Sequence, residues 1–145
     1  MKSLSGIFKI VNLIAMIGWA VLVFLPNWSL ADSFIKSGVV VILSIFYLYI
    51  LFIRKNIPGE VYPKGNFTDL EGVINLFKNP KAILGGWVHY LAFDLLIGLY
   101  IRNQANIIGM SHWLQIPCFV LTLMFGPAGY LLFWIMQFLI TSSGV

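Results

Sequence analysis

The stretch "GWVHYLAFDLLIG", Gly86 to Gly98, is apolar enough to lie inside a lipid bilayer, yet it carries His89 and Asp94. It belongs to a hydrophobic segment over residues 82–101, which has the length that a membrane-spanning helix needs. At about 1.5 Å per residue, His89 lies roughly 10 Å into the hydrocarbon and Asp94 roughly 18 Å, near the middle of a core about 30 Å thick. A carboxyl group at that depth costs at least about 2.5 to 3.5 kcal/mol. Asp94 should therefore face the interior of a helical bundle, find hydrogen-bond donors and keep its proton.

The composition agrees with a membrane protein. The chain of 145 residues is 60% hydrophobic and 10% charged, whereas soluble domains carry about 25% charged residues. This length suits one membrane domain over residues 1–145. The net charge of +4 is typical of basic cytoplasmic loops, so nucleic-acid binding is not expected. A single cysteine, Cys118, excludes an intrachain disulfide, and no ligand pattern predicts a metal or another cofactor.

Four hydrophobic segments predict an all-α bundle of four transmembrane helices, over residues 6–25, 33–53, 82–101 and 113–141. The first resembles a signal peptide, but its apolar run is too long for one, so we expect an uncleaved span. The last segment is longer than a bilayer requires, and Pro127 inside "FGPAG" should kink or break it. An alternative with three spans would leave this last segment split or half exposed.

The basic residues predict the orientation. Four spans place the two termini and the loop after the second span on one side, together with seven of the nine Lys and Arg residues. We therefore expect a protein of the bacterial inner membrane with both termini in the cytoplasm. The seven residues are Lys2, Lys9, Arg54, Lys55, Lys64, Lys78 and Lys81.

The loop between the second and third spans contains a predicted amphipathic helix over residues 69–78. Its apolar side chains, Leu70, Val73, Ile74 and Phe77, share one face at helical spacing, and Thr68 or Asp69 can cap its N-terminus. We expect this interfacial helix on the cytoplasmic membrane surface. Two interpretations stay open: a plain connector that shields the mouth of the bundle, or a lid over a lipid-filled cavity.

His89, Tyr90 and Asp94 are the candidate catalytic residues. Tyr90 precedes Asp94 by four positions and shares its face of the helix. His89 precedes Asp94 by five positions, which turns the two side chains about 140° apart, so a direct contact between them is not expected in a straight helix. Both could instead be structural hydrogen-bonding groups.

A candidate binding pocket combines polar residues at matching depths with aromatic rings. Two hydroxyl groups come to the level of Asp94 as candidate donors, one amide comes to the level of His89, and aromatic side chains could line a pocket for a long apolar ligand. Ordinary packing of the aromatic rings is the alternative. The candidate ligand-binding residues are Asn12, Ser44, Trp87, Phe93, Thr122 and Phe125.

Two runs of the sequence resemble the ABA4-like family. They are "WVHYLAFD", from Trp87 to Asp94, and "PCFVLTLMFGPAG", from Pro117 to Gly129, and they occur in the family's order. The plant member of this family is required to form neoxanthin from violaxanthin. The resemblance therefore implies an isoprenoid or carotenoid ligand in the membrane, and an isomerisation that needs an acid and a base but no redox cofactor.

In that chemistry Asp94 would be the acid, His89 the base or relay, and Tyr90 the residue that orients Asp94. A second interpretation is a non-catalytic carrier or scaffold that holds an isoprenoid for a partner membrane enzyme. An ion or proton pathway is less consistent with the sequence, because Asp94 has few polar neighbours at other depths.

Overall fold

The computed structural model describes residues 2–53 and 59–142, and this part of the chain is helical without a strand. The predicted end of the second span at Arg54 and Lys55 lies outside the described residues. The first helix is α1 (Lys2–Phe24). A second long helix runs from Ala31 to Ile53 as α2 (Ala31–Ser33), the π-helical η1 (Phe34–Val40), α3 (Val41–Leu48) and the π-helical η2 (Tyr49–Ile53). The remaining helices are α4 (Leu70–Leu76), α5 (Pro80–Ile107), α6 (His112–Phe125) and α7 (Pro127–Ser142).

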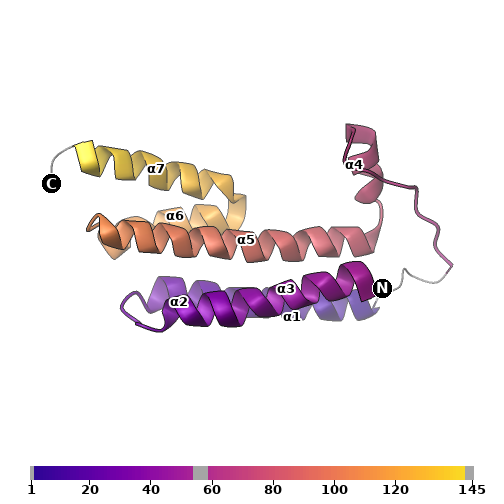
Figure 1. Ribbon diagram of the computed structural model, residues 1–145, viewed down its shortest axis with the longest axis horizontal. Helices are drawn as coiled ribbons and strands as arrows, with labels where there is room; N and C mark the ends of the chain where they lie inside the picture. Colours follow the sequence, from indigo (N-terminus) through magenta and orange to yellow (C-terminus); the bar gives the residue numbers. More distant parts are fainter. Residues whose placement is uncertain (1, 54–58, 143–145) are drawn as a thin grey trace.

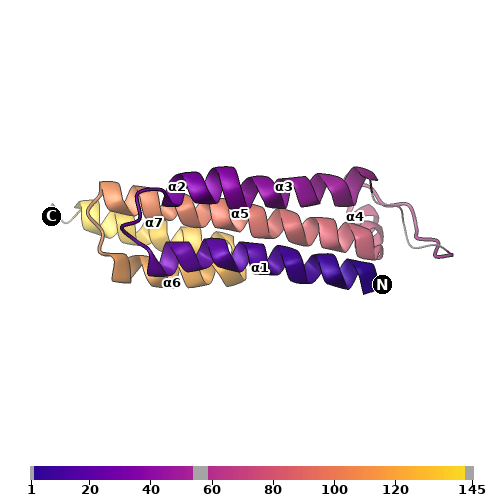
Figure 2. The same cartoon turned by 90° about the horizontal axis from the view of Figure 1, so that it is seen from below.

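Three helices are long and apolar enough to cross a membrane: residues 4–24, residues 31–53 and α5. They lie side by side and alternate in direction (Figures 1 and 2). α5 packs against α1 and the second helix on one side and against α6 and α7 on the other. The α1–α5 contact is close because Gly98 has no side chain: a Cβ there would lie 2.7 Å from Cη2 of Trp19. The integral membrane character expected from the sequence is supported by these three helices.

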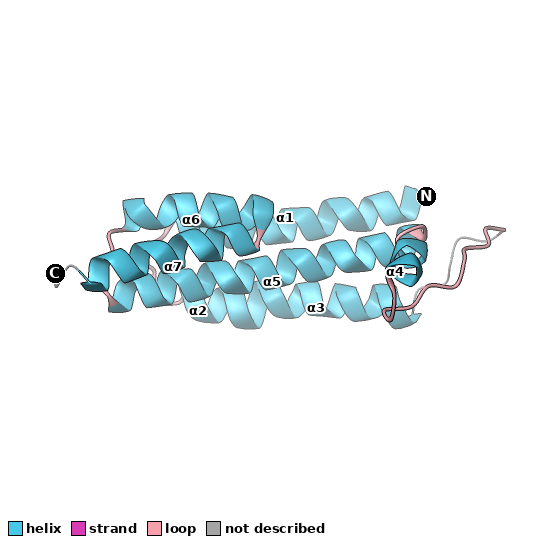
Figure 3. Ribbon diagram, turned by 90° about the horizontal axis from the view of Figure 1, so that it is seen from above, coloured by secondary structure: helices cyan, strands magenta, loops and turns pink. Residues whose placement is uncertain are grey.

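The C-terminal segment does not form the predicted fourth span. α6 ends at Phe125, Gly126 adopts φ +48° and ψ −99°, and α7 then runs back beside α6 (Figures 1 and 3). Each of these helices is about 21 to 24 Å long, roughly half of the 42 Å or so of α5. The break at Pro127 is confirmed, because proline cannot continue the α6 hydrogen bonds. The expectation of one crossing helix over 113–141 is wrong, because the glycine conformation reverses the chain instead of bending it.

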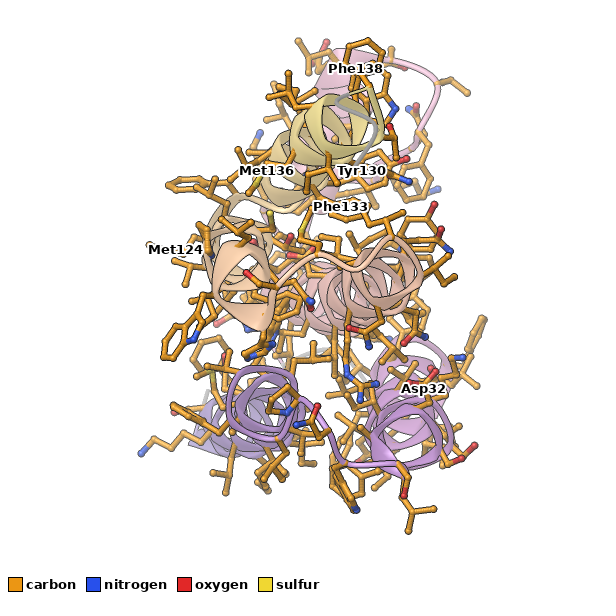
Figure 4. All side chains as sticks on the ribbon, turned by 90° about the vertical axis from the view of Figure 1, so that its left-hand side faces the viewer. Asp32, Met124, Tyr130, Phe133, Met136 and Phe138 are labelled. Atoms are coloured by element: carbon orange, nitrogen blue, oxygen red, sulfur yellow. The ribbon has the colours of Figure 1, made fainter. Side chains whose placement is uncertain are left out.

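The α6–α7 hairpin is held together by small and apolar side chains. A Cβ on Gly129 would overlap Oγ1 of Thr122, so only glycine allows the two helices to approach this closely. The Thr122 hydroxyl donates to the Cys118 carbonyl oxygen at 2.8 Å. Figure 4 shows Phe133 on the inner side of α7 and Phe138 on its outer side, and their exposed fractions are 1% and 58%. The hairpin is therefore a packed unit.

This reversal also changes the placement of the chain ends. The start of α1 and the end of α7 lie at opposite ends of the bundle (Figures 1 and 2). Both termini were expected on one side because four spans return the chain to the side where it began. Three helices long enough to cross, followed by a hairpin, leave the two chain ends at opposite ends of the bundle instead. α4 lies at the same end as the start of α1 (Figure 1).

A buried arginine fixes the opposite end of the bundle. Arg102 of α5 is 8% exposed, and its Nη1 lies 2.8 Å from Oδ1 of Asp32. Its Nη2 donates to the carbonyl oxygens of Pro26 at 2.9 Å and Trp28 at 3.3 Å. Asn103 donates to the other carboxylate oxygen of Asp32 at 2.7 Å. These bonds attach the loop between the first two long helices to α5.

The loop helix α4 is shorter than predicted. Asp69 is its N-cap, and Oδ1 of Asp69 accepts a hydrogen bond from the Gly72 N–H at 2.7 Å. Leu70, Ile74 and Phe77 are 50% exposed or more. Val73 is half-buried, and Phe77 also lines a groove against α5. The location of this apolar face on the membrane surface stays a prediction.

Candidate functional site

Asp94 lies midway along α5, against the turn of the hairpin. Its side chain is 8% exposed. A Cβ built on Gly126 would lie 3.0 Å from Oδ1 of Asp94, so the carboxyl group occupies the space that a side chain would need. Oδ2 of Asp94 is buried and has no hydrogen-bond partner among the described residues. An unpaired buried carboxyl oxygen is costly, which makes this position a candidate for chemistry or for ligand binding.

Tyr90 lies one turn before Asp94 on α5 and bonds to the end of α6. Its hydroxyl donates to the Leu123 carbonyl oxygen at 3.2 Å. The carbonyl groups in the last turn of a helix lack intrahelical partners, so Tyr90 satisfies one of them. Asp94 faces the start of α7, where the helix dipole favours negative charge. Tyr90 and Asp94 are four positions apart on one face of α5, and together they contact both ends of the hairpin turn.

A groove lies between the first turns of α1 and of α5 and extends along α5 as far as Trp87. Trp87 lies at its edge: its ring stacks on Tyr90 with centroids 5.5 Å apart, and its indole N–H donates to Oδ1 of Asn12 at 3.2 Å. Trp87, Tyr90 and Asp94 follow one another along one face of α5, and the hairpin contacts this face only from Tyr90 onward. The groove has a volume of about 600 Å³. Its lining residues are Leu4, Ser5, Phe8, Pro80, Ile83, Leu84 and Trp87, and we call it the α1 groove.

His89 lies on another face of α5. Its ring stacks on Phe93 at 4.4 Å and faces Tyr47 of α3 at 5.9 Å, and it lines a separate groove of about 520 Å³ next to α4. The wide angle expected between His89 and Asp94 is confirmed by these contacts. The structure therefore does not bring the two residues into one site.

The other predicted donors do not reach Asp94. Ser44 is exposed on α3, and its hydroxyl donates to the Val40 carbonyl oxygen at 2.8 Å. Thr122 is buried, but its hydroxyl is used inside α6. The sequence places both residues at the depth of Asp94, but depth does not show which way a side chain points. For Ser44 the predicted role as a hydrogen-bond donor to Asp94 is wrong, because its hydroxyl lies on the outer surface of α3.

The predicted ligand-binding residues divide between the two sides of α5. Asn12 and Trp87 contact each other at the α1 groove. Phe93 stacks on His89 and is 55% exposed. Phe125 ends α6 and is 61% exposed. These residues do not line one common pocket.

Comparison with protein families identifies the chain. A family model described as "ABA4-like: ABA DEFICIENT 4-like" matches residues 6–133. The chain belongs to the ABA4-like family. The match runs from α1 into α7, so this ABA4-like protein shares with its family the helices that form both grooves and the hairpin turn. No curated protein and no solved structure matches the chain.

Two contacts around Asp94 in this ABA4-like protein were missed by sequence reasoning. Gly126 packs against the Asp94 carboxyl group, and the backbone carbonyl of Leu123 accepts the hydrogen bond of Tyr90 beside it. The family run from Pro117 to Gly129 contained the relevant signal, because "TLMFGPAG" places two glycines around a proline. Its second glycine, Gly129, allows the close approach of Thr122, which a kinked single helix would not need.

Proposed function

We propose that this ABA4-like protein is a cofactor-independent isomerase of a carotenoid or another isoprenoid lipid, with Asp94 as the proton donor. The observation that carries the proposal is the buried Asp94 Oδ2 atom, which lacks a hydrogen-bond partner among the described residues. Tyr90 lies on the same face of α5 as Asp94 and stacks on Trp87 at the edge of the α1 groove. A ligand in that groove would approach the pair from the side that the hairpin leaves open.

The position of Asp94 suits proton transfer. Asp94 is about 21 Å along α5 from Pro80, at mid-membrane depth, where a carboxyl group holds its proton. Asp94 can protonate an oxygen of the substrate, and the carboxylate that remains can then accept a proton from carbon. The α7 dipole stabilises the carboxylate between the two steps. Because the same group gives and regains one proton, the isomerisation balances without a cofactor.

Replacement of Asp94 by Asn tests this proposal. The Asp94→Asn variant keeps the size of the side chain but cannot donate a carboxyl proton, so we expect a folded protein whose conversion of a carotenoid epoxide in membrane vesicles falls by about 10²-fold or more. Tyr90→Phe should lower conversion less, because it removes the orienting hydroxyl only. Ser44→Ala, on the outer face of α3, is the control and should convert at the normal rate. Full activity of Asp94→Asn would refute the acid role.

A non-catalytic carrier is the second candidate. Two observations favour it: the lining of the α1 groove contains no ionisable side chain, and the Tyr90 hydroxyl already donates to Leu123. A carrier would deliver an isoprenoid unchanged to a partner membrane enzyme. The lipid that co-purifies with the protein, identified by absorbance and mass spectrometry, would then be identical in the wild type and in Asp94→Asn. For an isomerase, substrate should accumulate in the variant.

A further inference from the structure

We propose that the groove beside α4 is a second ligand site, distinct from the α1 groove, and that His89 there binds the hydroxyl group of a lipid alcohol. The groove, called here the α4 groove, has a volume of about 520 Å³. Tyr47 and Leu51 line it from the second helix, Gly86 and His89 from α5, and Phe77 from the end of α4. It therefore lies between three elements that are far apart in the sequence.

Two polar side chains line this groove, His89 and Tyr47, and no hydrogen bond joins either of them to a described residue. Neither ring nitrogen of His89 is hydrogen-bonded to any described residue, although the ring is held by stacking on Phe93 and by its contact with Tyr47. His89 is about 13 Å along α5 from Pro80, which places it in the hydrocarbon below the interface. The ring is exposed on the surface of the bundle, so at this depth it faces lipid, where a polar group without a hydrogen bond is unfavourable. A partner for it would have to come from within the bilayer.

The chemistry of the groove identifies the class of that partner. A neutral imidazole presents one donor and one acceptor, and a hydroxyl group can pair with either. Tyr47, Phe77 and Leu51 provide apolar surface, and no charged side chain lines the groove, so a phosphate has no counter-charge there. A phosphate headgroup would also have to leave the interface to reach this depth. A lipid with a hydroxyl group on an apolar body fits these conditions.

Gly86 keeps the groove open. A Cβ at Gly86 would lie 3.6 Å from Cε1 of Phe77, which is ordinary van der Waals contact. A methyl group is thus tolerated there, whereas a branched side chain would fill the space between α5 and α4. This difference provides a matched pair of variants.

The test is photolabelling with farnesol that carries a diazirine group, and with a diazirine-bearing farnesene that lacks the hydroxyl, in lipid nanodiscs. We expect the alcohol to label peptides that contain Tyr47 and Leu51 about tenfold more than the hydrocarbon does. In His89→Phe, which keeps the aromatic stack, this preference should disappear, and in His89→Gln, which keeps a donor and an acceptor, it should remain. Gly86→Leu should abolish labelling and Gly86→Ala should retain it.

Controls separate this site from the proposed catalytic one. Trp87→Phe and Asp94→Asn lie on the other side of α5 and should leave the labelling unchanged, whatever their effect on conversion. Equal labelling by alcohol and hydrocarbon in the wild type would overturn the proposal. An unchanged preference for the alcohol in His89→Phe would also overturn it.

Discussion

Asp94 and Gly126 depend on each other, although 32 positions separate them in the chain. The Asp94 carboxyl group fills the space that a side chain at position 126 would need. The backbone conformation of Gly126 directs the start of α7 toward this carboxyl group. Tyr90 adds a hydrogen bond to the other side of the turn. One turn of α5 therefore determines where the hairpin lies, and the same residues form the candidate site.

We expect Gly126→Ala to destabilise the protein by about 1 to 3 kcal/mol, because alanine is strained at φ +48° and its Cβ would press on Asp94. Reversible unfolding in mixed detergent micelles measures this change. Gly6→Ala is a matched control in α1, since a Cβ there would meet nothing within 4 Å. Equal stability of the two variants would contradict the role assigned to the turn.

The ion pair of Arg102 allows a second comparison. Asp32→Asn should lower the free energy of unfolding by about 1 to 3 kcal/mol, because it removes the negative charge opposite a buried guanidinium and leaves only a neutral amide oxygen to accept its hydrogen bond. Lys36→Ala removes the second basic partner of Asp32. The Lys36 side chain is 56% exposed, so this change should cost less than about 0.5 kcal/mol. Similar losses in both variants would show that burial does not determine the strength of these pairs.

Among the helices, α4 depends on its cap. The hydrogen bond from the Gly72 backbone N–H holds the pKa of Asp69 below its usual value. A lowered pKa in the folded state means that the carboxylate stabilises the helix above the unfolded pKa, and that this contribution is lost as pH falls through the folded value. We expect the protection of the Gly72 amide, which is the intrinsic deuterium exchange rate at the same pH divided by the observed rate, to fall as pH drops through the folded pKa of Asp69, and Asp69→Asn to remove this pH dependence. A protection that changes with pH in the same way in both proteins would contradict the capping role.

The whole molecule, as far as it is described, has three helices long and apolar enough to cross a membrane, and a hairpin that reaches about half the length of α5. The start of α1 and the loop that contains α4 lie at one end. Five of the basic residues in the described part of the chain belong to these segments or to the first turn of α5: Lys2, Lys9, Lys64, Lys78 and Lys81. The positive-inside rule therefore predicts that this end is cytoplasmic, and three crossings would bring the end of α7 to the opposite side.

A reporter fused after the last residue should accordingly report the external side, whereas one inserted near Gly65 should report the cytoplasm. A third fusion in the loop at Asn27 should be external and serves as the control for the first span. A cytoplasmic signal from the C-terminal fusion would mean that the last segment crosses the membrane after all.

The sequence by itself determined what depends on spacing within one element. Hydrophobic length predicted the three helices that are long and apolar enough to cross a membrane, although it also predicted a fourth. Proline chemistry predicted the break before Pro127, and helical periodicity predicted that Tyr90 would share a face of α5 with Asp94 while His89 would lie on another. Asp69 could be recognised as a cap because capping is a bond over three residues. These relations are local, so the neighbouring helices do not change them.

Only the tertiary structure decided the direction of the chain after Gly126, the partners of Asp94 and the division of the predicted pocket into two grooves. Depth counting placed Ser44 level with Asp94, but the rotation of each helix is set by how its small residues pack, as Gly98 does against Trp19. A glycine before a proline permits either a bend or a reversal. The reversal is realised because Gly129 fits against Thr122 and because the Asp94 carboxyl group fits against Gly126, and both contacts form only when the helices are assembled.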